Sequence, residues 1–153
     1  MAATHNTKEV VATVTLTNSI KDITKNEWDI CGGVDNPFLS YDFMSSLEDS
    51  GSVGPETGWL PQHLLYRNSS KKLIGIVPLY LKGHSYGEYV FDWGWADAFE
   101  RAGQKYFPKL LSAVPFTPVT CPKLFVCPGE NKQQVHSVLV NGLVSALTQL
   151  NVS

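Results

Sequence analysis

Carboxylates, aromatic rings and a histidine are concentrated in residues 84–97, which read HSYGEYVFDWGWAD. Side chains of a β-strand alternate between two faces, so this pattern predicts a strand with Glu88 and Asp92 on one face. The other face would carry aromatic rings, namely Tyr89, Phe91 and Trp93. Partial burial beside such rings raises a carboxylate's pKa toward the range that acid–base chemistry requires. The stretch therefore predicts a binding cleft with two candidate catalytic carboxylates.

A structural role explains the same residues. In that interpretation the aromatic side chains fill the core of a buried strand and the acids cap neighbouring backbone groups. Gly94 ends the predicted strand, and Trp95 begins a short helix that ends at Gly103.

The amino-acid sequence of this region also resembles that of a known family. The run HSYGEYVFDWGWADAFERAG, with NPFLSYDFMSSLEDSGSVGPETGWLPQHL before it and YFPKLLSAVPFTPVT after it, is similar to the Fem-like branch of the GNAT acyltransferase superfamily, labelled peptidoglycan biosynthesis or recognition. The resemblance covers about Asn36 to Phe125. One departure is Cys121, where the family pattern has a glycine before Pro122. Family members are over twice this length, so the resemblance implies the N-terminal part of such a protein.

The resemblance implies transfer of an acyl or aminoacyl group to an amine, with acyl-CoA or aminoacyl-tRNA as the donor and a small-molecule or peptide amine as the acceptor. A carboxylate would take the amine's proton, and backbone N–H groups would hold the oxyanion. The candidate bases are Asp92 and Glu88, with His84 next. The expected acceptor pocket is lined by Tyr86, Trp93 and Trp95, and His63 and Asp97 are further candidates that a structural role explains equally well.

The donor is not specified by a motif. GNAT enzymes hold a pyrophosphate on an Arg/Gln-x-x-Gly-x-Gly/Ala turn, because its backbone amides satisfy phosphate charge. The sequence has no such turn, and residues 129–134 offer a single glycine before the last predicted helix.

Composition excludes several other classes. The net charge is −2 and the sequence has no basic cluster, so no DNA partner is predicted. No apolar run approaches the ~20 residues that cross a bilayer. The N-terminus has neither a secretory core nor a transit leader, which favours the cytoplasm. The three cysteines, Cys31, Cys121 and Cys127, form no even framework, so reduced thiols are expected, and their spacing favours no metal site.

Periodicity predicts the remaining elements. We expect strands at 10–17, 62–67, 73–81 and 124–126, with the middle pair forming a hairpin around 68–72. Helices are predicted from Asn18 or Ser19 to Asp29, from Asn36 through Leu47, and from Asn131 to Leu150. Pro78 cannot donate a ladder hydrogen bond, so a bulge or a broken ladder is expected there.

These elements predict an α/β (α+β) fold, a mixed, mostly antiparallel sheet flanked by helices. We expect a flexible N-terminus at 1–9 and an incomplete GNAT-like domain at 10–153, with a further strand beginning at Leu150–Ser153. An uncovered last helix and sheet edge would favour self-association and leave this chain inactive alone. The alternative function is a non-catalytic peptide- or glycan-binding module that uses the aromatic cleft at 84–97.

Overall fold

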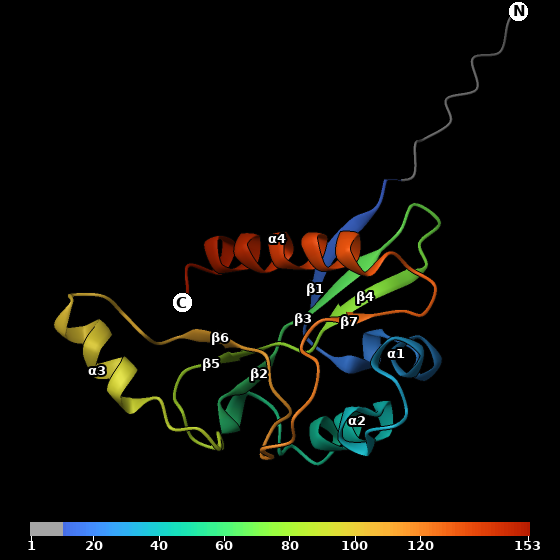
Figure 1. Cartoon of the computed structure of the whole chain (residues 1–153). Helices are drawn as coiled ribbons and strands as arrows, with labels where there is room; N and C mark the ends of the chain where they lie inside the picture. Colours follow the sequence, from blue (N-terminus) through green and yellow to red (C-terminus); the bar gives the residue numbers. More distant parts are fainter. Residues whose placement is uncertain (1–10) are drawn as a thin grey trace, which may run out of the picture.

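The computed structural model describes residues 11–153, and Figure 1 shows their arrangement. The strands are β1 (Thr13–Thr17), β2 (Trp59–Pro61), β3 (His63–Arg67), β4 (Leu73–Val77), β5 (Tyr80–Lys82), β6 (Lys109–Leu111) and β7 (Phe125–Val126). The helices are α1 (Lys25–Gly32), α2 (Tyr41–Asp49), α3 (Trp93–Arg101) and α4 (Lys132–Leu150), with 3-10 turns η1 (Ile20–Asp22), η2 (Pro37–Leu39) and η3 (Pro55–Thr57). The predicted α+β fold is confirmed, and the predicted flexible segment 1–9 lies outside the described residues.

The strands form two antiparallel sheets, one in the order β1-β3-β4-β7 and one in the order β2-β5-β6. Helix α4 covers one face of the four-stranded sheet, and α1 covers the other with α2 beside it (Figure 1). All five residues of β4 are buried, as expected for a strand covered on both faces. Gly75 of β4 allows the close approach of α4, because a Cβ there would lie 2.8 Å from Val135 Cγ1.

The two sheets separate where the prediction placed a broken ladder. Strand β4 ends at Val77, Pro78 interrupts the pairing, and β5 begins at Tyr80 in the second sheet. The backbone N–H of Leu79 donates to Nδ1 of His63 at 3.2 Å, so a side chain replaces the missing ladder partner. The hairpin therefore continues across both sheets with a change of direction at Pro78.

Two predicted helices are divided in the structure. Ser19 caps η1, Ile23 then adopts an extended conformation, and Thr24 begins α1 with a capping box to Glu27. The second cap is the stronger one, since Thr24 and Glu27 each satisfy a backbone N–H of the first turn. Ser40 likewise separates η2 from α2. The predicted cap at Asn131 is confirmed, and its side chain accepts from Gln134 N at 3.0 Å.

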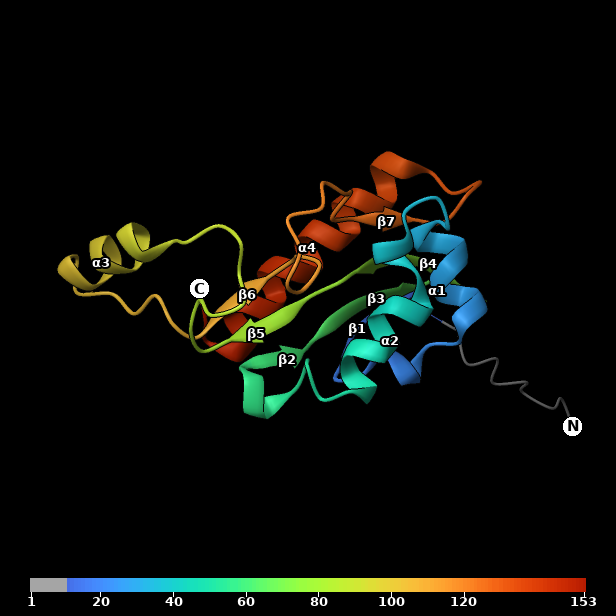
Figure 2. The same cartoon turned by 90° about the horizontal axis from the view of Figure 1, so that it is seen from below.

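The predicted strand at 84–93 is wrong. Strand β5 ends at Lys82, residues 83–92 form turns, and α3 begins at Trp93, two residues earlier than expected. The aromatic pattern does not form a strand because β5 pairs instead with β6, which comes after α3 in the sequence. Gly103 follows the end of α3 with φ of +73°, as predicted. Both views show α3 extending away from the sheets (Figures 1 and 2).

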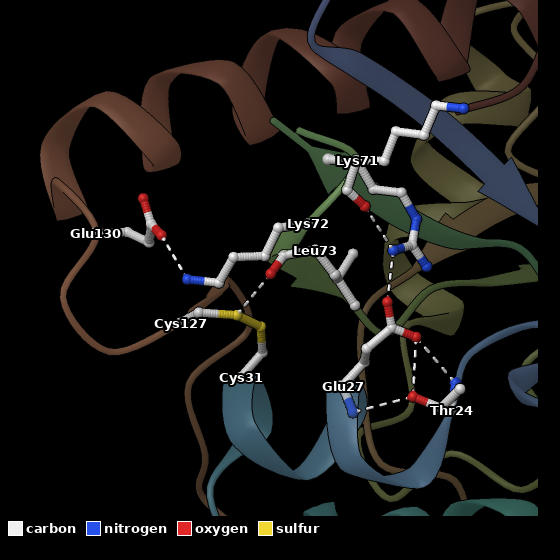
Figure 3. The surroundings of a disulfide bond; sticks show 9 residues. Thr24, Glu27, Cys31, Lys71, Lys72, Leu73, Cys127 and Glu130 are labelled. Carbon is white, nitrogen blue, oxygen red and sulfur yellow. Dashed lines mark hydrogen bonds and ion pairs between the residues drawn. A yellow bond between two sulfur atoms is a disulfide. The ribbon is translucent and has the colours of Figure 1, made fainter. Parts of the chain in front are cut away.

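The expectation of three reduced thiols is also wrong. Cys31 of α1 and Cys127 after β7 form a disulfide across 96 positions of the sequence, and Cys121 is free (Figure 3). Two ion pairs lie near this bond, Arg67–Glu27 at 2.5 Å and Lys72–Glu130 at 3.1 Å. A loop of that length is worth about 4–5 kcal/mol in the chain-entropy account of disulfides.

The last residue lies against the second sheet. Ser153 N donates to Pro108 O at 3.3 Å, and Leu110 N donates to Ser153 O at 2.7 Å. These two bonds have the pattern of parallel pairing with β6. Leu150 ends α4, so of the predicted strand start at 150–153 the structure has only this contact of Ser153.

Candidate functional site

The register of the three-stranded sheet places two lysines beside a tryptophan. Lys82 of β5 pairs with Trp59 of β2 on one side and with Lys109 of β6 on the other. Tyr80 and Lys82 are both buried while Leu81 is half-buried, so alternation along β5 directs the lysine inward. The Lys82 side chain is fully buried, and its ammonium lies 3.8 Å from the centre of the Trp59 ring. Two like charges thus occupy adjacent positions in a largely buried region.

The loop 83–92 supplies the compensating carboxylates. Lys109 Nζ donates to Glu88 Oε2 at 2.8 Å and also forms an ion pair with Asp92. Lys82 Nζ lies 3.9 Å from Glu88 Oε1 and donates to the carbonyl of Tyr86 at 2.8 Å. The loop therefore folds inward because each lysine needs an anion near it.

Asp92 is held firmly in its ionised form. Its Oδ2 accepts from Tyr106 at 2.5 Å and from Lys109, and its Oδ1 accepts from Ser85. Burial raises the pKa of Asp92, but hydrogen bonds from Lys109, Ser85 and Tyr106 outweigh it and lower the pKa to about 2. The predicted upward shift is therefore wrong for Asp92.

The pKa values of the two lysines shift in opposite directions. Burial lowers the pKa of Lys82 to about 8, and the negative charge of Glu88 offsets only part of this effect. Burial also acts to lower the pKa of Lys109, but its hydrogen bonds to Asp92 and Glu88 raise it overall. The difference follows from geometry, because Lys109 contacts two carboxylates directly and Lys82 contacts none within hydrogen-bonding distance.

Glu88 lies on the wall of a pocket of about 210 Å³ that we call the strap pocket. Trp59 forms part of the same wall, and the strap, residues 112–124 between β6 and β7, contributes Val114, Pro118 and Val119. Within residues 11–153, Glu88 Oε1 and Trp59 Nε1 are buried and have no hydrogen-bond partner. The pocket thus borders one free acceptor and one free donor in an apolar setting.

Gly87 is required for this arrangement. Its φ is +78°, and a Cβ at this position would lie 2.8 Å from Trp59 Nε1. The absence of a side chain lets the loop turn beside Trp59 and direct Glu88 toward the lysines.

A second hollow of about 240 Å³, the aromatic pocket, lies between the loop and α3. It brings together four of the predicted residues, His84, Tyr86, Trp93 and Asp97. His84 Nδ1 accepts from Tyr86 N at 3.2 Å, and the two rings lie 5.0 Å apart. Phe91 completes one side of the pocket.

The predicted residues therefore do not form one cleft. Glu88 borders the strap pocket, whereas Asp92 lies in the ion-pair cluster and, within residues 11–153, lines neither pocket. Trp95 is 69 % exposed on α3, outside both pockets of the described chain. His63 is fully buried between Trp28 and Tyr80, where its Nδ1 accepts the hydrogen bond from Leu79 N–H.

Sequence reasoning missed four residues of the cluster, namely Trp59, Lys82, Tyr106 and Lys109. The sequence carries one local signal for Lys82. This lysine lies two residues after Tyr80, so strand alternation places both side chains on the same, buried face. Lys109 has no such signal, since its position depends on pairing between strands separated by α3.

Among residues 11–153, no group of three or more His, Cys, Asp or Glu side chains is arranged to hold a metal ion. In the same part of the chain, each helix is too short or too polar to span a bilayer.

Comparison with known proteins gives one result. Residues 19–153 match the family FemAB-like, described as peptidoglycan biosynthesis/recognition. Neither the curated proteins nor the solved structures gave a match.

Proposed function

Since the chain belongs to the FemAB-like family, described as peptidoglycan biosynthesis/recognition, we propose that it transfers an acyl or aminoacyl group to an amine. The proposed donor is acyl-CoA or aminoacyl-tRNA, and the proposed acceptor is a small-molecule or peptide amine. The proposed chemistry takes place at the strap pocket and uses no metal. Its GNAT-like character rests on the resemblance of residues 36–125 to that superfamily.

The observation that carries this proposal is the free Oε1 of Glu88. Its other oxygen, Oε2, is held at 2.8 Å by Lys109, so the carboxylate is fixed. Oε1 is buried 3.9 Å from Lys82 Nζ and accepts no hydrogen bond among residues 11–153. An acceptor ammonium would donate to Oε1, which orients the nitrogen and offers a place for the proton that leaves it. Asp92 is a weaker choice of base, because both of its oxygens already accept hydrogen bonds.

Two neighbouring groups suit the oxyanion that forms when the amine attacks the acyl carbon. The Trp59 indole N–H is a donor without a partner in the described chain. The Lys82 ammonium lies 3.8 Å from the same ring and adds positive charge. Fixed donors and charges of this kind stabilise developing negative charge in a site shielded from water.

A second candidate function rests on the aromatic pocket. Tyr86, Phe91 and Trp93 are each more than 60 % exposed beside Asp97, which suits stacking on a sugar or peptide with a polar anchor. A module that binds without transfer would use this surface and leave Glu88 unused.

The test is amide formation by the purified chain. The protein is incubated with a primary amine and, separately, an acyl thioester or an aminoacyl ester, and the amide is measured by mass spectrometry. The sequence alone favours an inactive chain, but because Glu88 is fixed by Lys109 beside the pocket, we expect product that depends on protein, amine and donor together. Binding of a peptide or glycan without product from either donor would support the second candidate and contradict transfer.

A further inference from the structure

The strap forms one wall of the strap pocket, which Glu88 also lines. Residues 112–124 form neither helix nor strand, yet two of them, Val114 and Pro115, are buried. Phe116 packs on Trp59 with ring centres 5.4 Å apart. The strap is thus held by side-chain packing rather than by a strand ladder.

This closure shields the polar atoms that a ligand would reach. Glu88 Oε1 and Trp59 Nε1 are buried although they border the pocket, and within residues 11–153 neither has a partner. Unpaired buried polar atoms are costly, so the closed state is maintained by other contacts. A ligand reaches these two atoms only if part of the pocket wall moves, and the strap forms a large part of that wall.

The two ends of the strap are held differently. At one end, β6 is a three-residue strand, and all three residues pair with β5. At the other end, β7 is two residues long and pairs with β4 at two positions. Cys127 follows β7 immediately and is bonded to Cys31 of α1 (Figure 3). The disulfide therefore fixes the end of the strap that has the shorter ladder.

We propose that the Cys31–Cys127 disulfide is a redox-operated latch that keeps the strap closed over the pocket. A dithiol reductant would supply two electrons and two protons, break the S–S bond to give two thiols, and itself become a disulfide. The β7 end of the strap then loses its covalent link to α1 and is held only by non-covalent contacts, namely the two ladder positions, the Cys127 N–H bond to Ile74 O and the packing of Phe125 on Trp28, so that the pocket opens more often.

Hydrogen exchange measured by mass spectrometry tests the latch without any assumption about transfer. Backbone exchange at the β7 end of the strap, residues 125–127, is compared in the full chain before and after reduction by a dithiol, with reduction checked by mass after alkylation. These amides include the Cys127 N–H, which donates to Ile74 O at 3.0 Å and is therefore protected while the end stays in place. Exchange of β3 serves as the internal reference for global folding. Cys31→Ser lacks the bond permanently, and Cys121→Ser is the matched control because Cys121 is the free thiol.

We expect reduction to speed exchange at 125–127 by about tenfold or more while β3 remains protected. Cys31→Ser should show fast exchange with or without reductant, and Cys121→Ser should behave as the unmodified chain. Unchanged exchange at 125–127 after complete reduction would overturn the proposal. If Cys31→Ser fails to fold, the comparison of the unmodified chain before and after reduction tests the proposal. An equal loss of protection in β3 on reduction would contradict it, because the bond would then hold the whole fold rather than the strap.

Discussion

Replacement of Asp92 by asparagine removes one of the two carboxylates that balance the buried lysines. The pKa of Asp92 falls from the ordinary 3.8 to about 2 because of Lys109, Ser85 and Tyr106. At about 1.36 kcal/mol for each pKa unit, this shift corresponds to at most roughly 2.5 kcal/mol. The side chain retains 13 % exposure, and solvent screening reduces the expected contribution to about 1–2 kcal/mol.

The stability that the Asp92 carboxylate contributes depends on pH. A depressed pKa stabilises the folded chain above the unfolded value of 3.8, and this contribution is lost as the pH falls through the folded value of about 2. Asp92→Asn should therefore lower the free energy of unfolding by about 1–2 kcal/mol near pH 7 and by roughly half as much near pH 3.

Urea unfolding followed by circular dichroism measures both values. Asp35→Asn is the matched control, since Asp35 is exposed. The reasoning is refuted if Asp92→Asn is as stable as the control near pH 7, or if its deficit is the same at both pH values.

The other predictions concern the two neighbours of Glu88. Gly87→Ala should lower stability by about 1–3 kcal/mol, because the positive φ and the contact with Trp59 both disfavour a Cβ. Thermal melting checks this against Gly83→Ala, where a Cβ meets nothing within 4 Å, and equal melting of the two variants would contradict it. Lys82 should titrate with a pKa of about 8 in spectra of ¹³C-labelled lysine, with its signal identified by loss in Lys82→Met, because burial disfavours its charge. Titration of that signal above about pH 10, the ordinary range for lysine, would show that burial does not perturb the group.

The elements that could be predicted are those specified by neighbours in the sequence. The β3–β4 hairpin follows from two apolar runs around a polar turn, and α4 follows from its cap at Asn131 and its apolar stripe. The break at Pro78 follows from its missing N–H. In each case the information lies within a few residues.

What could not be predicted depends on contacts between distant residues. The alternation of Tyr89, Phe91 and Trp93 is a strand pattern, but the edge of β5 is occupied by β6. Cys31 and Cys127 are 96 positions apart, and no local spacing indicates their proximity. The opposite roles of Glu88 and Asp92 also depend on where Lys109 enters the sheet.

The central claim is that the free oxygen of Glu88 receives the proton of the acceptor amine. The measurement that tests it most directly is the rate of amide formation by Glu88→Gln relative to Glu100→Gln, which makes the same change at an exposed position of α3. We predict a loss of about 10²- to 10⁴-fold for Glu88→Gln and an unchanged rate for Glu100→Gln. Equal rates for the two folded variants would contradict the claim and remove Glu88 from the reaction.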